Sequence, residues 1–133
     1  MNDKQLMAEA LKAREKSYSP YSNFCVGAAL LCKNGKVYTG CNIENAAYTP
    51  TNCAERTAIF KAVSEGERDF EAIAIVGGKK GEQGRFCAPC GVCRQVIAEF
   101  CDKDFKIVLG DKDNVEVCTL DTLLPLSFTN KAL

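Results

Sequence analysis

The chain has 133 residues, with 17 basic and 17 acidic side chains, nine cysteines, and neither histidine nor tryptophan. This length suits one domain with a buried core, and we expect a single domain over residues 1–133. The balanced charge argues against a nucleic-acid partner, and the missing histidine excludes Ser-His or Cys-His nucleophile pairs and histidine-ligated metals.

The first half of the chain predicts a helix, a β-hairpin and a second helix. Residues 3–16 place apolar side chains on one side and charges on the other, as in an amphipathic helix. Strands are expected at 24–32 and 36–41, because the Asn-Gly pair at 34–35 is a strong hairpin signal. Apolar spacing predicts a helix over 53–65, which ends before a glycine.

The second half predicts three further strands and two helices. Residues 72–76 are nearly all apolar, as in a strand covered on both faces. A helix is expected at 91–100, then strands at 105–109 and 115–118 and a short helix at 120–124. This order predicts a three-layer α/β/α sandwich around one five-stranded mixed sheet. The side chains expected to face the core are Leu6, Met7, Ala10 and Leu11 in the first helix and Val92, Val96, Ile97 and Phe100 in the helix at 91–100.

The cysteines indicate the compartment. Their number is odd, so they cannot all pair within one chain. Residues 1–5 include no apolar run of signal-peptide length, and no stretch approaches the length of a membrane span. We therefore expect a cytoplasmic protein with no membrane partner. In such a reducing compartment, clustered thiols are more often metal ligands or reactive groups than cross-links.

Three cysteines fall at predicted helix starts. Cys53 opens the helix at 53–65, and Cys90 and Cys93 lie at the start of the helix at 91–100. Unpaired backbone N–H groups and the positive end of a helix favour thiolates at such positions. Two helix starts that converge would supply three sulfurs to one zinc ion per chain.

The residues beside these cysteines suit a catalytic zinc. Glu55 is well placed to move protons next to the metal, although its position alone also fits an ordinary charge at a helix start. Three thiolates leave excess negative charge around a dication. Arg56 and Arg94 can donate hydrogen bonds to the sulfurs and offset that charge, whereas the alternative for both is a solvated surface role.

Cys87 leaves alternatives open. As a fourth sulfur it would close the site and make the zinc structural, whereas three protein ligands leave a position for water. Its place in the loop, separated from Cys90 by the stiff Pro89, favours the open, catalytic site. A thiol redox protein that uses Cys90 and Cys93 as a dithiol is a third interpretation.

At these residues the chain resembles a known family. Cys53-Ala54-Glu55-Arg56 and Pro89-Cys90-x-x-Cys93-Arg94-Gln95 are similar to the motifs of the zinc-dependent cytidine deaminases, in their small homotetrameric branch with three cysteine ligands. The one visible departure is Ala88, where serine is expected; the family uses the backbone carbonyl there, so alanine changes little. Further similar segments, which extend the resemblance over about residues 6–128, are Tyr18-Ser19-Pro20-Tyr21-Ser22-x-Phe24-x-Val26-Gly27-Ala28-Ala29, Gly40-Cys41-Asn42-Ile43-Glu44-Asn45-Ala46 and Leu123-Leu124-Pro125.

The resemblance implies hydrolytic deamination of cytidine and 2′-deoxycytidine to uridine and 2′-deoxyuridine, with release of ammonia, as in pyrimidine salvage. Cys53, Cys90 and Cys93 would hold the zinc ion and a water. Glu55 would take the proton of that water and pass it to ring nitrogen 3 of cytosine. Hydroxide would attack carbon 4, and Glu55 would assist the departure of ammonia.

The resemblance also implies how substrate is held. Asn42 and Glu44 would hydrogen-bond the ribose, and the Ala54 backbone N–H would bond the base carbonyl. Phe24 would pack on the nucleoside. Phe128 would stack on the base in a neighbouring subunit's site, so the sites of a homotetramer would be shared. Without the resemblance, an aromatic at a strand start is more often a core residue, and polar loop residues are more often solvated.

Two other functions share parts of this pattern. A deaminase of another aminopyrimidine nucleoside, such as a blasticidin-type antibiotic, would keep the zinc and Glu55, and the ribose loop at 42–45 favours cytidine over it. A non-catalytic zinc module would use Cys87 to close the site.

Overall fold

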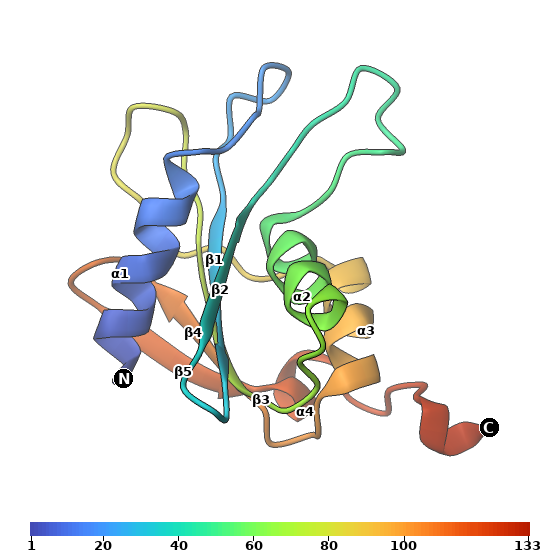
Figure 1. Cartoon of the computed structure of the whole chain (residues 1–133). Coiled ribbons are helices and arrows are strands. Elements are labelled where there is room, and N and C mark those ends of the chain that lie inside the picture. Colours follow the sequence, from blue (N-terminus) through green and yellow to red (C-terminus); the bar gives the residue numbers. More distant parts are fainter.

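Five strands form one sheet in the order β2-β1-β3-β4-β5 in the computed structural model, which describes residues 1–133 (Figure 1). β3 and β4 run parallel, and every other neighbouring pair is antiparallel. The predicted five-stranded mixed sheet is therefore confirmed. The strands are β1 (Gly27–Cys32), β2 (Val37–Cys41), β3 (Phe70–Val76), β4 (Lys106–Gly110) and β5 (Val115–Thr119).

Helices cover both faces of this sheet, which confirms the three-layer arrangement. α1 (Asp3–Arg14) packs on one face, and α2 (Ala54–Ser64) and α3 (Gly91–Phe100) pack on the other, beside the short α4 (Leu120–Leu123) (Figure 1). α3 belongs to the crossover that parallel strands require between β3 and β4. A single 3₁₀ turn at Asn130–Ala132 follows near the C-terminus.

Alternating side chains of the strands feed two separate cores. On β1, Ala28 and Leu30 pack into the core under α2 and α3, whereas Ala29 and Leu31 pack under α1. All six residues of β1 are buried. Because both faces are covered, the central strands read as continuous apolar runs.

Glycine lets a helix lie close to the sheet at two places. A Cβ atom at Gly40 on β2 would lie 2.6 Å from the backbone oxygen of Ala54 at the start of α2. A Cβ atom at Gly27 would overlap the backbone oxygen of Ala10 on α1. The position of α2, and of the residues at its start, therefore depends on the missing side chain of Gly40.

The predicted elements all occur, with shifted bounds. β1 begins three residues later than expected, because Phe24 and Cys25 pair with the loop at 78–79 instead. β3 begins two residues earlier, at Phe70. None of the helices has the length and hydrophobicity needed to cross a bilayer.

The inward faces of two helices were predicted incorrectly in part. In α1 the fourth buried residue is Ala13, and Leu11 is only half-buried. In α3, Val92 is 58% exposed, because the helix is rotated so that Cys93 points inward. The buried residues of α3 are Cys93, Ile97 and Ala98.

Candidate metal centre

Two helix starts meet on the same side of the sheet and bring three sulfurs together. Cys53 is the N-cap residue of α2 and Cys90 that of α3, and neither thiol bonds the backbone N–H groups of its own helix. Cys93 lies one turn into α3 and is fully buried. The three Sγ atoms lie within 4.8 Å of one another, as the helix-start argument predicts.

The spacing of these sulfurs fits zinc. The Sγ atoms of Cys53 and Cys90 are 3.7 Å apart, close to the edge of about 3.8 Å that a tetrahedral ion with Zn–S bonds of about 2.3 Å requires. The Cys87 sulfur is not part of this cluster. Three thiol donors without a fourth are the donor set of a zinc that keeps one position for water.

Arg56 lies on the first turn of α2, in contact with the sulfur of Cys53. Its Nη2 donates a hydrogen bond of 3.2 Å to the Sγ of Cys53. Its Nε is buried without a partner in the protein. An unpaired guanidinium N–H is costly to bury unless nearby negative charge offsets it, and thiolates bound to a cation provide that charge. Arg56 therefore fits the predicted role of offsetting the thiolates.

The thiols around the site differ in their acidity. Hydrogen bonds from the Cys93 thiol and from the Arg56 guanidinium lower the pKa of Cys53 to about 5. The same Cys93–Cys53 bond, followed by burial, raises the pKa of Cys93. Cysteine ligands must be deprotonated, so metal binding would release protons from these thiols. Burial and the nearby Glu55 carboxyl raise the pKa of Cys87, which keeps that thiol protonated.

Glu55 is a buried carboxyl beside the cluster. It is 4% exposed on the first turn of α2, two residues after Cys53. Burial raises the pKa of Glu55 to about 7. A carboxyl with this pKa can both accept and release a proton near neutral pH, which is what a general acid–base catalyst requires.

Phe24 lies at the same edge of the site. Its half-buried ring and the Cβ atom of Cys87 both pack against Gly77, where a Cβ atom would lie 2.9 Å and 2.8 Å from them. The Arg85 guanidinium stands 5.6 Å from the centre of the Phe24 ring. The structure therefore brings Phe24 next to the loop at 87–90, which leads to Cys90 and is called the metal loop from here on.

Asn42 is more engaged within the chain than its predicted role in substrate binding suggests. Its Oδ1 accepts hydrogen bonds from the Val26 backbone N–H at 2.9 Å and from the Ser17 hydroxyl. Its Nδ2 donates to the backbone oxygen of Phe24 at 2.8 Å. Since an amide nitrogen carries two hydrogens, one N–H remains for a ligand.

Glu44 is held by the turn before β1. Its Oε1 accepts the backbone N–H groups of Tyr21 and Ser22 at 2.9 and 3.1 Å, and its Oε2 accepts the Ser22 hydroxyl. These bonds, that of the Ser22 hydroxyl first, lower the pKa of Glu44 and keep it ionised. The carboxylate lines an open cavity of about 410 Å³ with the exposed Tyr48.

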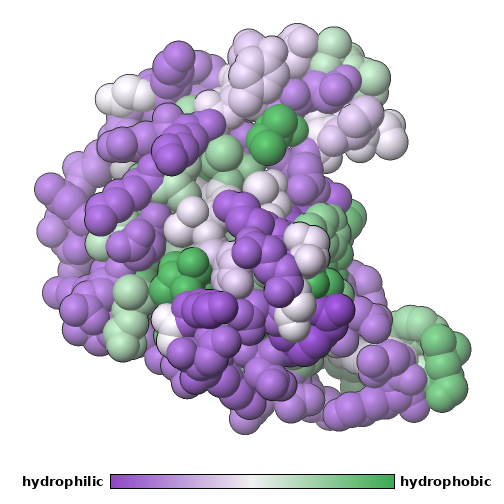
Figure 2. Space-filling model, viewed as in Figure 1, coloured by the Kyte–Doolittle hydropathy of each residue, from purple (hydrophilic) through white to green (hydrophobic).

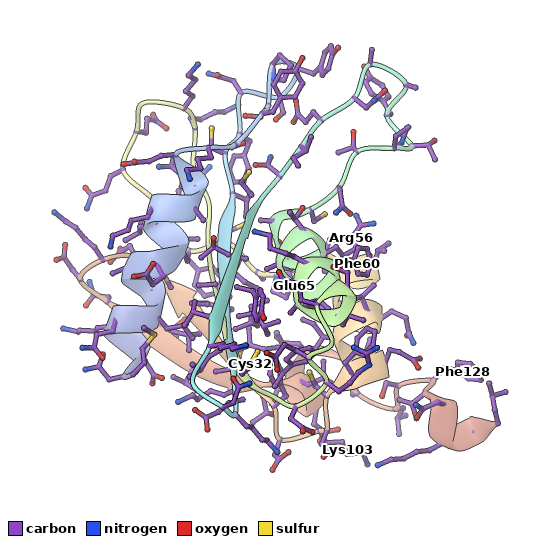
Figure 3. The ribbon with its side chains drawn as sticks, viewed as in Figure 1. Cys32, Arg56, Phe60, Glu65, Lys103 and Phe128 are labelled. Carbon is purple, nitrogen blue, oxygen red and sulfur yellow. The ribbon has the colours of Figure 1, made fainter.

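Phe128 and Arg94 make no contact with the sulfurs. Phe128 is 65% exposed on the C-terminal segment, well away from Arg56 (Figure 3). The prediction that Arg94 bonds a sulfur is wrong: its Nε donates to the Pro89 oxygen at 2.8 Å and its Nη1 to the Leu123 oxygen at 2.7 Å. The sequence held no signal for these carbonyl partners, because backbone oxygens look alike in every residue.

Comparisons with known proteins point in one direction. The family described as "Cytidine and deoxycytidylate deaminase zinc-binding region" matches residues 1–109. A cytidine deaminase of Sporosarcina psychrophila is 52% identical over 100% of this chain and 96% of its own length, and one of Halalkalibacterium halodurans is 54% identical over 97% and 96%. The crystal structure of a cytidine deaminase from Burkholderia pseudomallei superimposes with a TM-score of 0.88 at 48% identity, covering 96% of this chain and 100% of that one.

Proposed function

The chain belongs to the cytidine and deoxycytidylate deaminase family, and we propose that Cys53, Cys90 and Cys93 hold its zinc ion while Glu55 moves the protons. The reaction is the hydrolytic deamination of cytidine, with a zinc cofactor. The observation that carries this assignment of roles is the meeting of three sulfurs with one buried carboxyl at the starts of two helices.

The proposed roles follow from the chemistry of each side chain. When bound, zinc acts as a Lewis acid that makes a water molecule nucleophilic near neutral pH. Glu55 accepts a proton from the water and delivers it to ring nitrogen 3 of cytosine as the water oxygen bonds to carbon 4. Glu55 then takes the remaining proton of that oxygen and passes it to the 4-amino nitrogen, which leaves as ammonia while the carbon 4 carbonyl forms. Its raised pKa suits both directions of transfer. Arg56 offsets the excess charge of three thiolates through its bond to Cys53.

We propose four substrate contacts from the same chain. The remaining Nδ2 hydrogen of Asn42 and the carboxylate of Glu44 bond the ribose hydroxyls. The Ala54 N–H bonds the base carbonyl; as the first N–H of α2, it has no partner within the helix. Phe24 packs on the nucleoside from the edge of the metal loop.

We further propose that the protein is a cytoplasmic homotetramer in which Phe128 reaches the base in a neighbouring subunit's site. The free state of all nine cysteines is compatible with a reducing compartment. The surface in Figure 2 is mostly hydrophilic, with apolar side chains in several patches, one of them on the projecting C-terminal segment. Large apolar side chains left exposed by the single chain include Tyr48, Phe60, Val92, Leu126 and Phe128.

An ultraviolet assay of cytidine conversion to uridine, with and without a strong chelator, tests the function. We expect turnover by the purified protein, its loss after zinc is removed, and its return when zinc is added back. Deoxycytidine and blasticidin S serve as parallel substrates. Turnover that survives complete removal of metal would contradict the zinc mechanism, and turnover of blasticidin S alone would replace cytidine as the substrate.

A further inference from the structure

The C-terminal segment at 125–128 is held to the body of the protein by few interactions. Pro125 has no N–H group, and residues 125–128 take part in no backbone–backbone hydrogen bond. The Leu126 side chain is fully exposed, and its backbone has a positive φ of 52°. The segment therefore lacks both the sheet or helix bonds and the packing that normally fix a chain in place.

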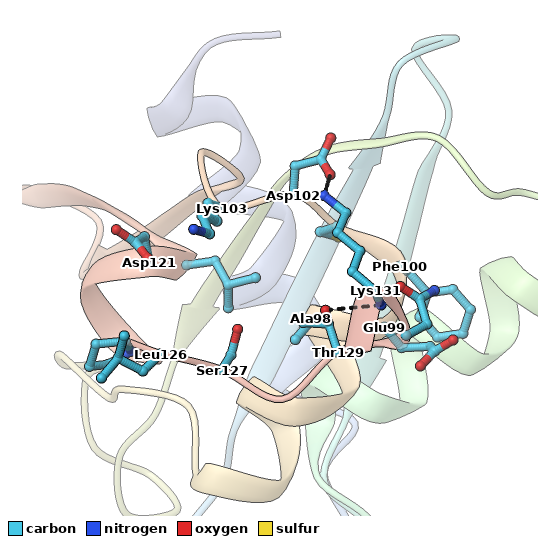
Figure 4. A pocket seen from close by; sticks show the side chains of 14 residues that line it. Ala98, Glu99, Phe100, Asp102, Lys103, Asp121, Leu126, Ser127, Thr129 and Lys131 are labelled. Carbon is cyan, nitrogen blue, oxygen red and sulfur yellow. Dashed lines mark hydrogen bonds and ion pairs between the residues drawn. The ribbon is translucent and has the colours of Figure 1, made fainter. Parts of the chain in front are cut away.

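A cavity adds to this separation. A volume of about 580 Å³ lies between the end of α3 and the chain from Pro125 to Lys131 (Figure 4). Beyond it, an ion pair of 3.8 Å connects Lys131 to Asp102, and both side chains are about four-fifths exposed. Such an exposed pair contributes little to holding the segment.

Two consecutive side chains of α3 supply the connections that remain. Arg94 donates to the carbonyl oxygen of Leu123 at the end of α4, and Gln95 donates to that of Phe128 at 2.8 Å. Arg94 is partly buried, and its second donor bonds the oxygen of Pro89, the residue before Cys90. The Arg94 guanidinium therefore joins the loop before Cys90 to the end of α4, where the C-terminal segment begins, and Gln95 bonds the far end of that segment.

We propose that Arg94 and Gln95 are positioning residues that set the location of Phe128 relative to the metal loop of their own subunit. Because Phe128 reaches the base in a neighbouring subunit, the affinity for that base then depends on the metal loop of the subunit that supplies Phe128. This inference depends on the proposed contact between Phe128 and the base. Neither residue touches substrate or zinc. Gln95 acts only through the segment, whereas Arg94 acts through both the segment and the Pro89–Cys90 loop.

The two residues should have different kinetic signatures. Gln95→Ala removes one hydrogen bond to the segment, so we expect KM for cytidine to rise about three- to fivefold while kcat stays near its original value. Arg94→Met also frees the loop that carries Cys90, so it should lower kcat as well as raise KM. Arg94→Lys keeps the charge but cannot bond two carbonyls in a fixed fork, and should restore only part of the loss.

A double-mutant cycle with Phe128→Ala tests whether the effect passes through the aromatic ring. We expect Gln95→Ala to raise KM in the original protein and to have no further effect once the ring is gone. Lys131→Gln is the matched control, because it removes the exposed ion pair from the same segment and should leave KM unchanged. Zinc content and native mass are measured for every variant.

The outcomes separate the two proposals. If Phe128→Ala leaves KM unchanged, the proposed contact with the base is wrong. If Phe128→Ala raises KM but Gln95→Ala does not, or if the two effects on KM multiply independently, the positioning role of Gln95 is overturned. A rise in KM with Lys131→Gln as large as that with Gln95→Ala would assign the effect to general loosening of the segment.

Discussion

Glu55 and Arg56 occupy adjacent positions on α2, yet their surroundings give them different tasks. Glu55 turns into the protein, where burial raises its pKa to about 7. Arg56 keeps its charge and directs it at the sulfur of Cys53. At the scale of single residues, direction and burial thus distinguish the residue proposed to carry protons from the one proposed to offset the charge of the site.

Replacing the carboxyl of Glu55 tests its task directly. Glu55→Gln keeps the size of the side chain but cannot exchange a proton, so we expect kcat for cytidine to fall by at least about 100-fold. Zinc content, measured by atomic emission, and the circular dichroism spectrum should match those of the original protein. Normal turnover by this variant would show that another group moves the proton.

Cys87 offers a second test at this scale, because it separates an open site from a closed one. Its thiol lies outside the sulfur cluster, so we expect Cys87→Ser to retain about one zinc per chain and most of the activity. Cys90→Ser is the comparison that should lose zinc. Loss of metal and of folding in Cys87→Ser would indicate a structural zinc with four sulfurs.

At the scale of helices and strands, sequence patterns predicted the types of the elements well and their orientations less well. All five strands and four helices occur, because apolar periodicity and turn residues are local signals. The rotation of α3 was missed, since its apolar stripe suggested that Val92 faces inward, whereas Cys93 is the buried residue there. The cluster of three sulfurs was predictable, because helix starts and cysteines are both visible in the sequence.

The contacts that sequence could not predict depend on tertiary approach. Asn42 uses most of its hydrogen-bonding capacity on Ser17, Phe24 and Val26. Arg94 bonds carbonyl groups that lie 5 and 29 positions away. Each partner is a common group whose availability becomes known only when the layers are in place.

The close approach of α2 to β2 gives a prediction for this scale. A methyl group at Gly40 would meet the backbone of Ala54 and Ala58, so Gly40→Ala should push the start of α2 outward. We expect a loss of about 1–3 kcal/mol in the free energy of unfolding, together with faster release of zinc to a chelator. Urea unfolding and a colorimetric zinc assay measure the two effects.

Gly27→Ala is the matched comparison. It creates a similar overlap with the backbone of α1, on the face of the sheet without sulfurs. It should destabilise the protein while zinc release from the folded state keeps its original rate. Equal acceleration of zinc release in both variants would mean that stability as a whole, rather than the placement of α2, controls the metal.

For the molecule as a whole, the question is whether one chain makes a complete site. The three sulfurs come together within the chain, with Arg56 bonded to one of them, whereas Phe128 lies exposed on the C-terminal segment, well away from Arg56 (Figure 3). An aromatic ring that is 65% exposed in the single chain is explained if a second copy covers it.

Hybrid assemblies test the shared site. Glu55→Gln and Phe128→Ala subunits are co-expressed with different affinity tags, and assemblies that carry both are purified. Random assortment would put an intact Glu55 and a neighbour's Phe128 together in about a quarter of the sites. We therefore expect turnover with the original low KM, which neither parent shows. If the hybrids show only the kinetics of the two parents, each site is built from one chain.

The arrangement of the layers has a practical consequence. α1 covers the face of the sheet opposite the sulfurs, and the C-terminal end projects on the side of α3 (Figure 1). A reporter domain or immobilising linker attached before α1 would therefore extend from the side remote from the chemistry. The same addition after Leu133 would lie close to the segment that carries Phe128 and could displace it. Biosensors built on this scaffold should therefore be anchored through the N-terminus.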